Sequence, residues 1–265
     1  MNKSQLKPGF SIAFLLSACL AAGCGGTKVL KEPQPIQTTQ PLAAISDQGI
    51  ALTLDWVIVR DGPGTWAKNA DWDEYLLRVS NVSDQSIQIT RLIVVDSLDT
   101  PIESQPGRKR LVKASKQSSR RYKKSGIEVK AGAGAGTMLV AGAAVTVVGV
   151  GVASAAATGA IMSGSTAVGG AGAVAGGLLL LGPALAVGGI VRGFNNSAVN
   201  NQIEQRQTIL PLEAATGEEV ALNVFFPIAP SPQRVKLAYT DTTGEHTLVI
   251  DTSEALNGLH LITPD

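Results

Sequence analysis

The sequence predicts a mainly β protein: a β-sandwich of immunoglobulin-like layout, interrupted by an inserted α-helical transmembrane hairpin. Apolar and polar residues alternate in two blocks, 49–107 and 194–252. Between these blocks, the 61 residues 131–191 contain no Asp, Glu, Lys, Arg, His, Asn or Gln. Neither block is expected to close a core alone, whereas seven or eight short strands together can form one sandwich. Two separate small β-domains are the alternative.

The N-terminus, "MNKSQLKPGFSIAFLLSACLAAGC", has the pattern of a secretory signal peptide over residues 1–23. Lys3 and Lys7 supply the positive segment, and an apolar run and small residues follow, ending at Cys24. The alternative is cleavage after Ala18, which would leave Cys24 without a role.

Residues 20–24, "LAAGC", resemble the lipobox of bacterial lipoproteins. The resemblance implies cleavage before Cys24 and diacylation of its thiol, and Gly25 in place of Asp implies the outer membrane. Each buried CH₂ adds roughly 0.8 kcal/mol, so two or more acyl chains make a stable anchor. Residues 24–48 are rich in Gln, Pro and Thr, and we expect them to tether the folded part flexibly.

The first block predicts four strands. "IALTLDWVIVR" begins at Ile50, "DEYLLRVS" at Asp73, and the apolar pairs Ile87/Ile89 and Leu92/Val94 follow a polar turn at 81–85. The second block predicts four more, in 207–213, 218–227, 234–241 and around Leu248 and Ile250, with a hairpin turn at 241–245. Residues 253–265 are predicted to form a tail.

A basic segment, 108–130, leads into the apolar stretch. Residues 108–124, "RKRLVKASKQSSRRYKK", hold nine Lys or Arg and no acid. Juxtamembrane clusters of this kind bind anionic head groups at about 1 kcal/mol per cation. The predicted lipid contacts are Arg108, Lys109, Arg110, Arg120, Arg121, Lys123 and Lys124. A solvated basic loop or a nucleic-acid patch is the alternative, but only Tyr122 is aromatic, so we expect no nucleic-acid partner.

The stretch 131–193 is long enough for two membrane-spanning helices, since one needs about 20 apolar residues. We expect them at 138–161 and 171–191, joined by the turn "SGSTAVGG" at 163–170. Small residues four apart allow helices to approach closely and predict self-association through a glycine zipper. The candidate packing residues are Gly151, Ala155, Gly159, Gly172 and Gly176.

This layout is similar to the TraT group of outer-membrane lipoproteins, in the lipobox at 20–24 and the Gly/Ala-rich segment 131–191. The resemblance implies a lipid anchor and a homo-oligomer or an envelope complex. The β-strand segments do not resemble that family's soluble domain, so its biological roles are not carried over.

The sequence shows no catalytic constellation, and we expect no enzyme activity, cofactor, metal or small-molecule substrate. His246 and His260 are expected to be structural or solvated. The predicted function is therefore that of a lipid-anchored, membrane-embedded envelope lipoprotein whose periplasmic β-sandwich meets a protein partner. Two alternatives stay open. One is a pore or translocation component, and the other is a cell-wall or glycan-binding module using Trp66 and Trp72.

Overall fold

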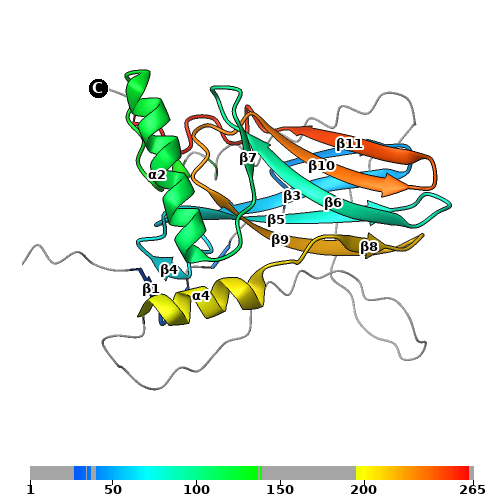
Figure 1. Ribbon diagram of the computed structural model, residues 1–265, viewed down its shortest axis with the longest axis horizontal. Coiled ribbons are helices and arrows are strands. Elements are labelled where there is room, and N and C mark those ends of the chain that lie inside the picture. Colours follow the sequence, from blue (N-terminus) through cyan, green and yellow to red (C-terminus); the bar gives the residue numbers. More distant parts are fainter. Residues whose placement is uncertain (1–26, 34, 37–39, 137, 139–194, 263–265) are drawn as a thin grey trace, which may run out of the picture.

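The computed structural model describes residues 27–33, 35–36, 40–136, 138 and 195–262. Two antiparallel sheets form most of the described fold (Figure 1). The first has the order β2-β3-β5-β9, with bounds Ala43–Asp47, Ile50–Ile58, Trp72–Asn81 and Glu219–Pro227. The second has the order β11-β10-β6-β7, with bounds Gly244–Asp251, Arg234–Asp241, Ile87–Val95 and Pro101–Glu103.

Three short strands complete the β structure of the described residues. β8 (Leu212–Ala214) pairs with β6 near its start, while β7 pairs near its end. β1 (Lys28–Val29) and β4 (Ala67–Lys68) form a separate two-stranded sheet.

The two alternating blocks share one core. β9, from the second block, pairs with β5 from the first over nine residue pairs, and β10 pairs with β6. Two separate β-domains therefore do not describe this chain. The buried inner faces are lined by Leu52, Leu54, Tyr75, Leu77, Val79, Leu222, Val224 and Phe226 in the first sheet and by Ile87, Ile89, Leu92, Val94, Val235, Leu237, Leu248 and Ile250 in the second.

A β-bulge changes the predicted alternation in β3. Leu54 lies opposite Leu77, but Trp56 lies opposite Leu76, so the register shifts at Asp55. A bulge places two residues against one and moves the side chains that follow to the other face. Val57, and not Trp56, therefore continues the inner face that starts at Ile50.

Two helices lie at one end of the sandwich (Figure 1). α2 spans Arg108–Lys124 and α4 spans Asn195–Arg206. α2 packs on β5 and β9 and contacts α4. This cover explains why the first six residues of β5 are all buried, where the sequence pattern predicted one exposed face.

The predicted fold class is wrong in two respects. The layout is not that of an immunoglobulin domain, whose third strand lies in the sheet opposite the second. Here the third long strand, β5, pairs directly with β3. The transmembrane helical hairpin is not supported either, because none of the helices that the structure describes is long and apolar enough to span a membrane.

The start of the predicted hairpin belongs to the β-domain. Ala135 and Met138 are buried in its core. A Cβ on Gly132 would lie 2.2 Å from the carbonyl oxygen of Arg60, and one on Gly134 would lie 2.7 Å from that of Gly258. Both glycines have positive φ, which disfavours other residues. Glycine at these two positions is thus required by close backbone packing, and residues 131–136 belong to the β-domain instead of starting a membrane helix.

The rest of the predicted hairpin lies outside the described residues. This holds for the turn at 163–170 and for all five candidate packing residues, which are Gly151, Ala155, Gly159, Gly172 and Gly176. Cys24 lies outside them as well.

Candidate anion-binding surface

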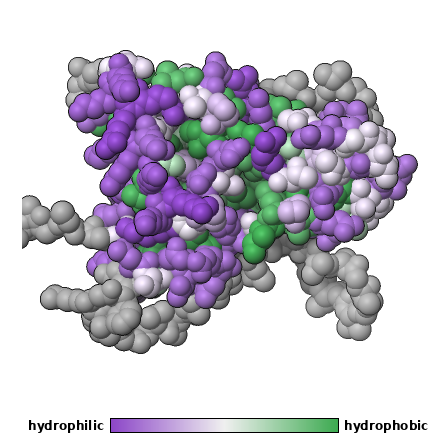
Figure 2. Space-filling view, in the orientation of Figure 1, coloured by the Kyte–Doolittle hydropathy of each residue, from purple (hydrophilic) through white to green (hydrophobic). Residues whose placement is uncertain are grey.

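The outward face of α2 carries a cationic stripe of seven exposed residues. They are Lys109, Arg110, Lys113, Lys116, Arg120, Lys123 and Lys124. Most are spaced three or four apart and so share one side of the helix. The buried residues Leu111, Ser115, Ser118 and Tyr122 occupy the opposite side. None of the seven forms an ion pair with a described residue. Figure 2 shows strongly hydrophilic surface over this helix.

Two of the predicted lipid contacts point toward the protein instead. Arg108 donates from Nη2 to Thr27 Oγ1 at 3.1 Å. Arg121 donates to Oδ2 of the fully buried Asp96 at 2.6 Å. Residue type alone does not show which of the nine basic residues of α2 face the domain. Only their spacing along the helix distinguishes the inward-facing ones from the outward-facing ones. The same spacing identifies Lys113 and Lys116, which the prediction omitted.

Buried hydroxyls hold α2 on the sandwich. Ser115 Oγ lies 2.5 Å from the carbonyl oxygen of Asp71, to which it donates, and accepts a bond from Ile228 N–H at 2.9 Å. Tyr122 Oη lies 2.9 Å from Ser97 Oγ and 3.2 Å from the carbonyl oxygen of Pro230. Burial raises the pKa of Tyr122 to about 12, so the hydroxyl stays protonated and can donate. The orientation of the stripe is therefore fixed.

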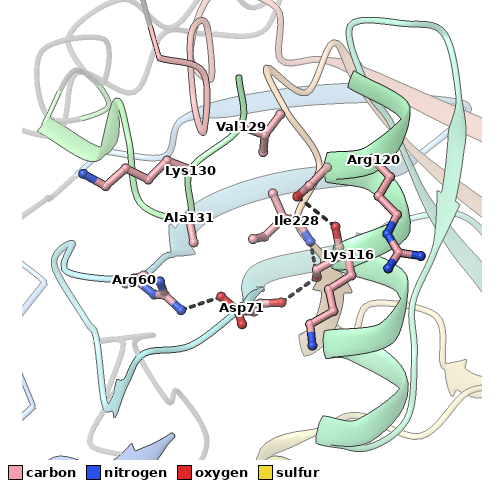
Figure 3. A pocket seen from close by; sticks show the side chains of 10 residues that line it. Arg60, Asp71, Lys116, Arg120, Val129, Lys130, Ala131 and Ile228 are labelled. Atoms are coloured by element: carbon pink, nitrogen blue, oxygen red, sulfur yellow. Dashed lines mark hydrogen bonds and ion pairs between the residues drawn. The ribbon is translucent and has the colours of Figure 1, made fainter. Parts of the chain in front are cut away.

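A cavity of about 440 Å³ lies beside α2 (Figure 3). Its fixed charged group is Arg60, which follows β3. Arg60 Nε donates to the carbonyl oxygen of Ala70 at 2.9 Å, and Nη2 donates to Asp71 Oδ1 at 2.5 Å. These bonds hold the guanidinium against the cavity, while Nη1 makes no hydrogen bond with a described residue.

The cavity combines positive charge with an apolar centre. Lys116 and Arg120 of α2 and Lys130 join Arg60 in its lining, against one carboxylate, Asp71. Val129, Ala131 and Ile228 lie between these groups, and Lys130 projects outward in the view of Figure 3. The lining therefore suits a ligand with both an anionic and an apolar part.

A buried His–Asp pair positions one wall of this cavity. His260 and Asp73 are both almost completely buried, with Nε2 and Oδ2 2.9 Å apart. Gly132 N–H donates to His260 Nδ1 at 3.1 Å, so the proton of a neutral ring lies on Nε2 and is donated to Asp73. Lys130 N–H donates to the carbonyl oxygen of His260. The segment predicted as a tail thus holds residues 130–132 against β5. His260 is a buried residue that stabilises this contact.

The two tryptophans proposed for glycan binding are not on the surface. Trp66 is 5% exposed and Trp72 is 3% exposed. Trp66 Nε1 donates to Glu74 Oε2 at 2.7 Å, and Glu74 also pairs with Arg206 of α4. Burial raises the pKa of Glu74, and Arg206 opposes this. Arg206 also lies over the Trp66 ring, so Trp66 and Glu74 join α4 to the sandwich. The glycan-binding alternative therefore loses its candidate residues.

Within the described ranges, no group of three or more His, Cys, Asp or Glu could hold a metal ion. Comparison of the chain with protein-family models, curated proteins and solved structures gives no match.

Proposed function

We propose that this chain is a lipid-anchored protein of the bacterial outer membrane that lies against an anionic membrane surface through the cationic stripe of α2. Cys24 would carry the lipid a few residues before β1. The predicted tether over residues 24–48 is not retained, because β1 and β2 pair with β4 and β3 of the β-domain and Leu42 lies in its core. The role is structural or interactive and not enzymatic, with the β-domain presented to a protein partner in the periplasm.

The observation that carries this proposal is the orientation of the stripe. Hydrogen bonds of Ser115 and Tyr122 fix the opposite face of α2. The seven cations are therefore exposed together, and none of them forms an ion pair with a described residue. Exposed like charges three or four residues apart repel each other slightly. A partner that supplies negative charge relieves this repulsion, and an anionic membrane does so over an extended area.

A vesicle-binding experiment tests the stripe apart from the lipid. The full chain carrying Cys24→Ser is incubated with vesicles of phosphatidylcholine, with or without phosphatidylglycerol, and bound protein is measured by flotation. We expect tighter binding to the anionic vesicles, weakening as salt screens the charges. Binding to the neutral vesicles measures what other segments contribute.

The variant that removes charge from the stripe is Lys109→Gln/Lys113→Gln/Lys123→Gln. It should lower the affinity for anionic vesicles by roughly fivefold per lysine, from about 1 kcal/mol each. Its matched control, Lys68→Gln/Arg91→Gln/Lys236→Gln, removes the same charge from β4, β6 and β10 and should change binding much less. Equal losses in the two variants would show that net charge matters and that the stripe does not.

The lipid anchor is tested separately by metabolic labelling with palmitate and by membrane fractionation. Label is expected on the wild-type chain in the outer membrane and should be lost in Cys24→Ala. Labelled Cys24→Ala protein, or wild type confined to the inner membrane, would contradict this part of the proposal.

A further inference from the structure

The cavity beside α2 differs from the cationic stripe in having one cation with a fixed position. Two bonds restrain the Arg60 guanidinium, one to the carbonyl oxygen of Ala70 and one to Asp71. A restrained arginine loses little further side-chain entropy when it binds an anion, and its planar donors suit phosphate oxygens. A freely moving surface lysine offers neither advantage.

The surrounding groups leave an excess of positive charge. Asp71 can offset one cation, and Lys116, Arg120 and Lys130 remain. A phosphate monoester fits this excess better than a carboxylate does, because it carries close to two negative charges and three terminal acceptor oxygens. Flexible lysines at the rim can reach such a group from different sides.

The apolar centre indicates what the phosphate is attached to. Val129, Ala131 and Ile228 lie between the charged groups (Figure 3), so a bound molecule would place part of its carbon skeleton on them. The cavity shares Lys116 and Arg120 with the stripe, so a ligand here would lie beside the surface that the stripe contacts.

We propose that this cavity binds the phosphomonoester headgroup of a membrane lipid, with Arg60 as the fixed contact and Lys130, Lys116 and Arg120 as mobile ones. The inference rests on the proposed membrane contact and adds selectivity to it: the stripe responds to surface charge, and the cavity recognises the headgroup.

Headgroup preference at matched surface charge tests the cavity. The full chain with Cys24→Ser is floated with vesicles containing phosphatidic acid, a monoester, or phosphatidylglycerol, a diester, adjusted to equal zeta potential. We expect wild-type residues in the cavity to give about a tenfold preference for phosphatidic acid, the effect of roughly one charge-assisted hydrogen bond. Absence of any preference would overturn the headgroup proposal while leaving the membrane contact intact.

Two variants test whether the cavity residues cause the preference for phosphatidic acid. Arg60→Gln/Lys130→Gln should abolish it, and Lys130→Gln alone should reduce it without affecting folding, since Lys130 is exposed. The control Lys123→Gln/Lys124→Gln removes two charges from the stripe outside the cavity and should weaken binding to both vesicles equally. A preference that survives in Arg60→Gln/Lys130→Gln would overturn the assignment.

A soluble competitor distinguishes the source of the phosphate. Glycerol 3-phosphate shares the headgroup chemistry but lacks acyl chains, and we expect it to compete only weakly with phosphatidic acid vesicles. If it removes the preference completely at low concentration, the cavity recognises a free phosphate ester and the lipid assignment is wrong. Failure to bind either anionic vesicle would instead overturn the proposed function itself.

Discussion

The inner and outer faces of α2 differ in whether their polar and charged groups have bonding partners in the domain. On the inner side, Ser115, Tyr122 and Arg121 each have a defined partner in the sandwich. On the outer side, seven cations have no described partner. Polar groups removed from water must be satisfied, and breaking such a bond is costly. Exposed charges carry no such requirement. The inner face therefore determines where α2 lies, and the outer face is free to meet another molecule.

Removal of the buried carboxylate at the inner face should have the largest effect on folding. Asp96 accepts bonds from Arg121 and from the N–H groups of Leu98 and Thr100. Asp96→Ala leaves all three without their acceptor and should lower the free energy of unfolding by about 2–4 kcal/mol. Urea denaturation measures this. The exposed Asp84→Ala should change it by no more than about 0.5 kcal/mol, and similar losses in both would refute the distinction.

Removal of the Ser115 hydroxyl should have the second-largest effect on the free energy of unfolding. Ser115→Ala leaves the N–H of Ile228 without its buried acceptor, at a cost of about 1–3 kcal/mol. Ser119→Ala is the matched control on the same helix, since Ser119 Oγ bonds only the carbonyl oxygen of Ser115 among the described residues. It should be neutral or slightly stabilising, because Ala is the better helix former. Thermal melts of both variants test whether Ser115 fixes α2.

The hydroxyl of Tyr122 should contribute less to the free energy of unfolding than Ser115 does, and its contribution should depend on pH. Tyr122→Phe removes bonds to Ser97 and Pro230 and should cost about 1 kcal/mol at neutral pH. The folded-state pKa of about 12 lies above the unfolded value near 10, so the folded state holds this proton more tightly. The stabilisation is fully present below pH 10 and is lost as the pH rises toward 12. Denaturation of both proteins across this range should show the difference shrinking, and a constant difference would contradict it.

The sequence pattern predicts the strands of the β-rich core, but it does not predict the segments that border this core. The inner-face residues of β5, β9 and β10 follow directly from alternation with period two. In β6 a register shift at Thr90 separates the pair Ile87/Ile89 from the pair Leu92/Val94. The helix α2 is marked in the sequence by the helical spacing of Leu111, Ser115, Ser118 and Tyr122, whereas its high charge by itself predicts only a basic segment. Gly132 could not be interpreted from the sequence, since its need for positive φ and for contact with Arg60 arises only from the tertiary fold.

The cavity could not have been predicted from sequence. Arg60, Lys116 and Lys130 are separated along the chain and are brought together by the pairing of β3 with β5, by Ser115, and by the contact of residues 130–132 with His260. No local pattern marks these contacts, because each depends on a partner distant in sequence.

The smallest effect on folding should come from the outer face, and its sign is informative. Lys109→Gln/Lys113→Gln/Lys123→Gln removes like charges spaced along one side of α2, each pair of which costs a few tenths of a kcal/mol. The free energy of unfolding should therefore stay constant or rise by up to about 0.5 kcal/mol, while binding to anionic vesicles falls. Urea denaturation at low salt measures the first, and flotation measures the second. If the variant were destabilised, the stripe would have a structural partner, and its assignment as a free binding surface would be wrong.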